Sequence, residues 1–115
     1  MPLLFSDLLD EWDAALDADD RYRALIEFGR RLPPMDPALK TSATRVPGCS
    51  ADVWVYPLEE GGVLHFQADS NADITRGVVA AIVSLVDGKT PSAILQVPIE
   101  AELEALGLKR HLSAN

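Results

Sequence analysis

Apolar side chains recur at helical spacing through the first third of the chain. One apolar stripe comprises Phe5, Leu8, Leu9, Trp12 and Leu16, and a second comprises Tyr22, Leu25, Ile26, Gly29 and Leu32. Such stripes predict two amphipathic helices. The acidic run between them offers Asp19 or Asp20 as a cap for the second helix. Pro33-Pro34 ends that helix, because the residue before a proline disfavours helical geometry.

The middle of the chain carries the signals of a β-hairpin. Residues 52–56 are rich in β-branched and aromatic side chains, and residues 63–68 alternate between two faces, which favours strands. Residues 59–62, two glutamates and two glycines, are typical of a hairpin turn. A short extended segment at residues 46–47 precedes the first of these strands. We expect a small antiparallel sheet of about three strands, with Trp54 in the core.

A long helix is predicted directly after the hairpin. Its apolar stripe comprises Ile74, Val78, Ala81, Ile82 and Leu85. Ser70 and Asp73 form a capping-box pattern ahead of it. Gly77 costs this helix about 1 kcal/mol relative to alanine, so we expect a close backbone approach to the sheet or to another helix there. Two shorter helices are predicted within residues 90–106.

The order of these elements defines the fold class. Two helices precede a small antiparallel sheet, and a long helix and shorter helices follow it, without alternation of strands and helices. This order predicts an α+β fold rather than an α/β fold. The 115 residues show no internal repeat and no linker, which predicts a single domain over residues 1–115.

Charge and hydropathy narrow the classes of partner. The formal net charge is -8 at pH 7, whereas nucleic-acid binding requires clustered Lys and Arg side chains. No run approaches the roughly 20 apolar residues that cross a bilayer. The N-terminus also lacks the basic region of a signal peptide. The sequence therefore predicts a cytoplasmic protein that binds neither nucleic acid nor a membrane.

Cys49 is the single cysteine, so neither an intramolecular disulfide nor an all-cysteine metal site can form within one chain. It follows the turn dipeptide Pro47-Gly48, which predicts a loop tip, where reactive groups are commonly presented. Arg45, four residues upstream, could stabilise a thiolate there. The alternative is a cysteine that only packs under the sheet, because free cysteine is among the most buried residue types.

The segment around this cysteine resembles the cysteine loop of the SufE family of sulfur-acceptor proteins. The matching pattern is Val46-x-Gly48-Cys49-x-x-x-Val53-Trp54. Four further segments resemble that family in the same order and with compatible spacing: Tyr22-x-x-Leu25-Ile26-Glu27-x-Gly29-x-x-Leu32-Pro33, Asp69-Ser70 with Ile74 and Gly77, Asp87-Gly88-Lys89-Thr90-Pro91 with Ile94-Leu95, and Leu106-Gly107-Leu108 with His111-Leu112-Ser113. The resemblance covers most of the chain and implies the two-layer SufE/NifU-like architecture.

Two features depart from the family pattern. The family commonly has a serine two residues after the cysteine, whereas this chain has Ala51 there and Ser50 directly after the cysteine. The family also continues past the His-Leu-Ser stretch into an arginine motif and a closing helix, whereas this sequence ends at Asn115. The resemblance therefore predicts a domain without the closing C-terminal helix.

The resemblance implies a function in iron–sulfur cluster assembly. SufE-like proteins accept a persulfide from a pyridoxal-phosphate-dependent cysteine desulfurase and stimulate that enzyme, rather than acting as stand-alone enzymes. By the same resemblance, Cys49 is the nucleophile that attacks the outer sulfur, as in thiol–disulfide exchange. The pyridoxal phosphate belongs to the partner, a SufS-like or CsdA-like desulfurase, so we expect no cofactor in this chain. A scaffold complex for iron–sulfur clusters is a candidate second partner.

A persulfide is vulnerable to reductants in solvent, so we expect a way to shelter it. The loop would tuck Cys49 against apolar neighbours such as Trp54 and then swing it out to meet the partner.

Three other functions stay open. A NifU-like cluster scaffold needs several thiolate ligands, and one cysteine per chain allows only a cluster bridged between chains. A cysteine-based thioltransferase or hydrolase needs a base near the thiol, for which only His111 is a candidate; we expect His65 to be solvated. A pure interaction module would leave Cys49 inert.

Overall fold

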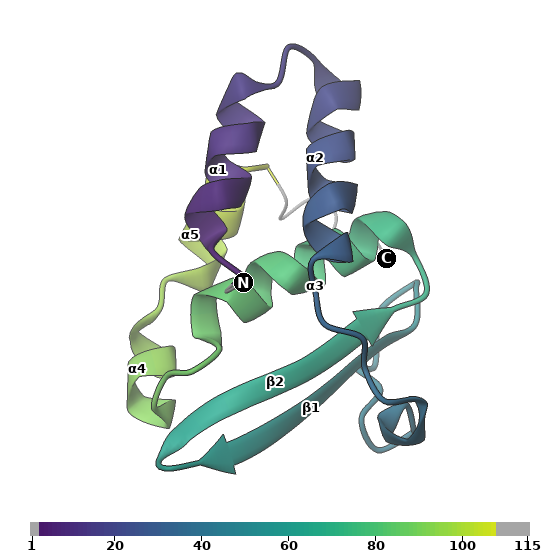
Figure 1. Ribbon diagram of the computed structural model, residues 1–115, viewed down its shortest axis with the longest axis vertical. Helices are drawn as coiled ribbons and strands as arrows, with labels where there is room; N and C mark the ends of the chain where they lie inside the picture. Colours follow the sequence, from purple (N-terminus) through teal and green to yellow (C-terminus); the bar gives the residue numbers. More distant parts are fainter. Residues whose placement is uncertain (1–2, 108–115) are drawn as a thin grey trace.

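The computed structural model describes residues 3–107 of the chain. In chain order the elements are α1 (Phe5–Ala14), α2 (Ala18–Arg30), the 3-10 helix η1 (Pro37–Leu39), β1 (Val53–Glu60), β2 (Val63–Ser70), α3 (Asp73–Val86), α4 (Pro91–Gln96) and α5 (Ile99–Ala105). Helices precede and follow an antiparallel hairpin (Figure 1), so the predicted α+β class is confirmed. No helix in this range is long and apolar enough to cross a membrane. His111 lies outside the described residues.

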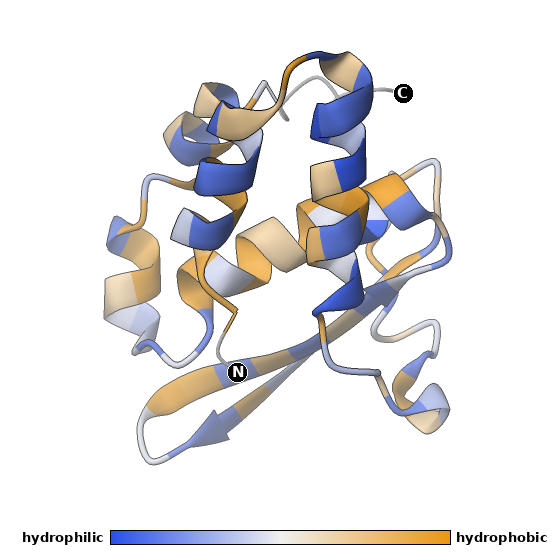
Figure 2. Cartoon of the chain, turned by 45° about the horizontal axis from the view of Figure 1, so that its top comes forward, coloured by the Kyte–Doolittle hydropathy of each residue, from blue (hydrophilic) through white to orange (hydrophobic). Residues whose placement is uncertain are grey.

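Helix α3 lies between two layers. Figure 1 shows α1 and α2 side by side above α3 and the hairpin beneath it, with α5 beyond α1. Figure 2 shows that α3 is largely apolar, whereas α1 and α2 also carry strongly hydrophilic positions. A helix that is apolar around most of its circumference is typically a buried one. Helix α3 therefore supplies core side chains to both layers.

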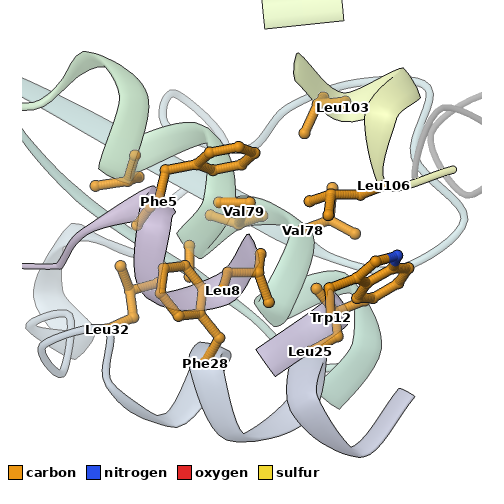
Figure 3. Packing of buried hydrophobic residues seen from close by; sticks show 14 of the residues in the cluster. Phe5, Leu8, Trp12, Leu25, Phe28, Leu32, Val78, Val79, Leu103 and Leu106 are labelled. Atoms are coloured by element: carbon orange, nitrogen blue, oxygen red, sulfur yellow. The ribbon is translucent and has the colours of Figure 1, made fainter. Parts of the chain in front are cut away.

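The main core lies where α1, α2, α3 and α5 meet (Figure 3). Its buried side chains include Phe5, Leu8, Trp12, Leu25, Phe28, Leu32, Val78, Val79, Leu103 and Leu106. The prediction that Trp54 belongs to the core is wrong. Since Val53 on β1 is buried, Trp54 next to it points to the other face of the hairpin, where it is partly exposed. There, Lys40 Nζ lies 5.2 Å from the centroid of the Trp54 ring.

Helices α2 and α3 approach each other closely at two glycines. A Cβ atom on Gly29 would lie 2.8 Å from the backbone nitrogen of Gly77, and a Cβ atom on Gly77 would overlap the carbonyl oxygen of Leu25. Neither contact can be tolerated unless the backbone of one helix moves. The expectation that Gly77 serves a close backbone approach is confirmed, and its neighbour is α2.

The hairpin is longer than the sequence predicted. Strand β1 pairs with β2 from Val53, opposite Ser70, to a two-residue turn at Gly61-Gly62. The φ angles of these glycines are 62° and 85°, and a tight hairpin turn of this kind needs positive φ at both positions. The strand thus runs through Pro57 to the turn, beyond the predicted end at residue 56.

The described part of the chain contains two strands, where the sequence predicted about three. The segment before the cysteine contributes only an isolated bridge between Arg45 and Trp54. Next to it, the Val46 amide donates a hydrogen bond to the Val53 carbonyl oxygen at 2.8 Å. The chain then turns at Pro47, so this pairing cannot extend into a third strand.

Two helix starts differ from the prediction. The N-cap of α2 is Asp17, whose side chain accepts a hydrogen bond from the Asp20 amide, rather than Asp19 or Asp20. Ser70 is still part of β2, because the pairing of the hairpin extends to it. The N-cap of α3 is Ala72, which supplies no side-chain acceptor.

A cluster of ion pairs fastens the loop after α2 to the sheet and to α3. The Asp69 carboxylate lies 2.6 Å from Lys40 Nζ and 3.1 Å from a terminal nitrogen of Arg76. Arg76 also donates hydrogen bonds to the carbonyl oxygens of Gly29 at 3.0 Å and Leu32 at 3.1 Å. Because the last carbonyl groups of a helix lack partners within it, Arg76 both satisfies the end of α2 and joins it to β2.

Candidate functional site

Cys49 lies in a loop of residues 47–52 between the Arg45 bridge and the start of β1. Pro47 and Gly48 form its turn, and Gly48 has a φ of 83°, which a residue with a side chain rarely adopts. The thiol is exposed. The cysteine therefore occupies the loop position that the turn dipeptide predicted, and it is not packed under the sheet.

Asp52 holds the base of this loop. Arg45 donates two hydrogen bonds to Asp52 Oδ1, from Nε at 3.0 Å and from a terminal nitrogen at 2.7 Å. The backbone amide of Asp52 donates to Asn71 Oδ1 at 3.0 Å, and the Asn71 amide donates to the Asp52 carbonyl oxygen at 3.2 Å. Arg45, which the sequence offered as a cation that could stabilise a thiolate, is thus paired with a carboxylate at the base of the loop.

An apolar groove of about 240 Å³ opens beside the thiol, between the hairpin and α3. Cys49, Ser50 and Ala51 form its edge on the loop. The walls include Val53, Val55 and Phe66 of the hairpin and Val78, Val79 and Ile82 of α3. The loop therefore presents its thiol at the border between solvent and a hydrocarbon-lined hollow.

The apolar neighbours of Cys49 are different from the predicted one. Trp54 is not among the residues that line the groove, because it points to the opposite face of β1. The side chains that do line it on this strand are Val53 and Val55, one position to either side. Strict alternation along the strand could have indicated these two residues. The contribution of α3 depends on tertiary packing and has no local signal.

The chemical groups at the groove suit exchange between sulfur atoms. Among the described lining residues, Cys49 is the only titratable one. No three His, Cys, Asp or Glu side chains within residues 3–107 are grouped so that they could hold a metal ion. His65 lies on the exposed side of β2, with Nδ1 3.4 Å from Asp87 Oδ2. A thiolate can attack a persulfide or disulfide without an adjacent base, because the leaving group is itself a thiolate.

Comparison with known proteins connects this chain to one family and to named relatives. The profile of the family described as "SufE: Fe-S metabolism associated domain" matches residues 6–115. The chain is 38% identical to the sulfur acceptor protein CsdE of Escherichia coli (strain K12) over 98 residues, which are 84% of this chain and 67% of CsdE. It is 36% identical to an uncharacterized SufE-like protein of Rhizobium meliloti (strain 1021), over 92% of this chain and 74% of that protein.

Two other similarities concern a larger protein and a solved structure. The chain is 39% identical, over 88% of its length, to the chloroplastic quinolinate synthase of Nicotiana tabacum, of whose length it spans 14%. The solution structure of a hypothetical protein from Thermus thermophilus superimposes with a TM-score of 0.69 at 22% identity, covering 99% of this chain and 82% of that one. At this identity the superposition shows a shared fold.

Proposed function

This chain belongs to the SufE family, and on that premise we propose that it is a sulfur acceptor in iron–sulfur cluster assembly, with Cys49 as the residue that carries the sulfur. The observation that supports this most directly is the exposed thiol on a loop that borders an apolar groove. CsdE, to which 84% of this chain aligns, is named a sulfur acceptor protein.

The proposed reaction is a transfer between two thiols. The Cys49 thiolate attacks the outer sulfur of a persulfide on the donor, a new S–S bond forms at Cys49 Sγ, and the S–S bond of the donor breaks. The donor cysteine leaves as a thiolate, and the outer sulfur keeps its proton until it ionises in water. The exchange needs no oxidant or reductant, and its two half-reactions through a covalent carrier predict ping-pong kinetics.

The groove provides the shelter that a bound persulfide needs. Once loaded, the outer sulfur can fold from the edge of the loop into the hydrocarbon-lined hollow between the hairpin and α3. Inside the groove, the surrounding side chains keep soluble thiols away from the sulfur. A single thiol also suits a carrier, because a second cysteine nearby would convert the persulfide into a disulfide and release sulfide.

The proposed donor is a pyridoxal-phosphate-dependent cysteine desulfurase of the SufS-like or CsdA-like kind, which the acceptor stimulates by removing its persulfide. The cofactor stays with that enzyme, and this chain supplies only the thiol, the loop and the groove. We place the pair in the cytoplasm, since the chemistry requires a compartment in which thiols are kept reduced. A scaffold complex for iron–sulfur clusters is the proposed recipient.

The test is to load the protein with sulfur and measure its intact mass. After incubation with a group II-type cysteine desulfurase and free cysteine, the intact mass measured without reductant should increase by one sulfur atom, and desulfurase turnover should rise. Cys49→Ser should abolish both effects. A second variant, Ser50→Cys in the Cys49→Ser background, moves the thiol by one residue and should recover little of either. Wild-type protein that gains no sulfur and does not stimulate the desulfurase would refute the proposal.

A further inference from the structure

Thr75 is one of two residues with a hydroxyl group among those that line the groove beside Cys49. It belongs to the first turn of α3 and is partly buried. The other side chains of α3 that line the groove are hydrocarbon, as are those of the hairpin. Ser50 is the second residue with a hydroxyl group in the lining, but it lies on the exposed loop directly after the cysteine. Thr75 is therefore the hydroxyl that the folded scaffold holds in place.

The hydroxyl of Thr75 has no hydrogen-bond partner among residues 3–107. A threonine inside a helix often donates to the carbonyl oxygen four residues earlier. For Thr75 that carbonyl belongs to Asn71, which precedes α3. A polar group that is cut off from water without a partner costs free energy. When the groove is filled and its water leaves, the hydroxyl needs an acceptor inside the groove.

The first turn of α3 leaves its amide groups without a side-chain cap, and it carries one acidic residue, Asp73. Its N-cap, Ala72, supplies no side-chain acceptor for the amides of the first turn. Amides left free at the start of a helix, together with the helix dipole, stabilise a nearby anion. A persulfide that has lost its proton is such an anion, and its outer sulfur is an acceptor for hydrogen bonds.

We propose that the Thr75 hydroxyl donates a hydrogen bond to the outer sulfur of the Cys49 persulfide and holds it in the groove as the anion. This inference rests on the proposed function of Cys49. No further co-reactant is involved, because the outer sulfur gives its proton to water after the transfer and the S–S bond stays intact. Delivery to a recipient then requires the loop to swing out, which breaks this hydrogen bond.

Thr75 thus favours retention of the sulfur over its loss to solvent. A soluble thiolate that attacks the persulfide must approach a negatively charged sulfur inside a hydrocarbon-lined groove, and both factors slow it. Without the hydrogen bond, the loaded loop would spend more time in the open position, where reductants reach the persulfide.

The test compares the lifetime of the persulfide in variants of Thr75. Thr75→Val keeps the volume of the side chain and removes the hydroxyl, whereas Thr75→Ser keeps the hydroxyl. Ser84→Ala is the matched control, because Ser84 also lies on α3 but donates to the Ala81 carbonyl oxygen and does not line the groove. Each protein is loaded by the desulfurase, freed of it, and exposed to reduced glutathione, and intact mass is followed over time.

We expect the persulfide of Thr75→Val to decay about tenfold faster than that of the wild type, since a hydrogen bond to a charged group typically changes an equilibrium by at least this factor. Thr75→Ser and Ser84→Ala should decay at rates close to the wild-type rate. If Thr75→Val does not fold, Thr75→Ala must show the faster decay instead. If the wild type loads normally and the persulfide of the hydroxyl-free variant decays at the wild-type rate, the role of Thr75 is wrong and the proposed function stands. Wild-type protein that does not load would overturn the proposed function as well.

Discussion

Asp69 is a buried carboxylate that depends on its neighbours to stay ionised. Burial raises its pKa, but the hydrogen bond from Lys40, the backbone hydrogen bond from the Ser70 amide and the positive charge of Arg76 together lower the pKa below its usual value. These partners come from three parts of the chain: the loop after α2, β2 and α3. The single side chain therefore couples segments that are far apart in the sequence.

Asp69→Asn should destabilise the protein by about 2–3 kcal/mol near neutral pH, because it leaves the Lys40 and Arg76 cations beside a neutral amide. A carboxyl whose pKa is lowered on folding contributes stability above its unfolded value of about 3.9, and this contribution is lost as pH falls through the folded pKa. The difference between variant and wild type should therefore shrink below about pH 4. Urea unfolding at several pH values measures it.

Asp13→Asn serves as the control for that measurement, since Asp13 is exposed on α1. Its unfolding free energy should stay close to the wild-type value at every pH. A constant difference between Asp69→Asn and wild type from pH 7 down to pH 3 would show that the Asp69 charge does not stabilise the fold.

The sequence could place the Cys49 thiol on a loop but could not indicate its surroundings. Cys49 follows a Pro-Gly turn and is the single cysteine, so its loop position was readable from local chemistry. Thr75 lies 26 positions later and has no local feature that links it to a thiol. It comes into the site because α3 crosses the inner face of the hairpin, and that crossing depends on packing between distant segments.

At the scale of elements, the contact between α2 and α3 depends on Gly29 and Gly77. The carbonyl oxygen of Leu25 occupies the place that a Cβ atom of residue 77 would need. Because this oxygen belongs to the backbone of α2, a side-chain rearrangement cannot relieve the overlap. The two helices would have to move apart, and the main core would open with them.

Gly77→Ala should therefore destabilise the protein by about 3 kcal/mol or more, which is the upper range for overpacking, although alanine is the better helix former. The matched control is Gly61→Ala in the hairpin turn, where φ is 62° and nothing lies within 4 Å of an added Cβ. That change should cost only about 1–2 kcal/mol, from the left-handed backbone conformation. Thermal unfolding of the two variants compares them, and equal losses would contradict the steric argument.

Pro57 shows why the length of a strand was hard to predict. A proline lacks the N–H group that a central strand needs, so a sequence pattern ends the strand before it. In the structure, the Val55 amide points away from β2 and donates to the Thr44 carbonyl oxygen. Pro57, two residues later, faces the same free edge and loses no hydrogen bond to β2. Whether a strand lies at an edge is a property of the sheet, which a local pattern does not contain.

At the scale of the whole molecule, both layers depend on α3. The inner face of the hairpin packs on one side of this helix, and α1 and α2 pack on the other. A two-stranded hairpin is marginally stable by itself in water, and two short helices are also marginally stable by themselves. The groove beside Cys49 therefore exists only while the helical layer holds α3 in place.

This shared helix predicts that the two layers unfold together, and the two tryptophans can report on them separately. Trp12 is buried in the helical layer, and Trp54 lies on the hairpin. In Trp12→Phe the remaining fluorescence reports the hairpin, and in Trp54→Phe it reports the helices. We expect that in each variant the urea midpoint from fluorescence coincides with the midpoint from far-ultraviolet circular dichroism. If the hairpin signal changed first, the sheet would open before the helices. The exposure of Cys49 would then be controlled by local unfolding of the hairpin rather than by movement of its loop.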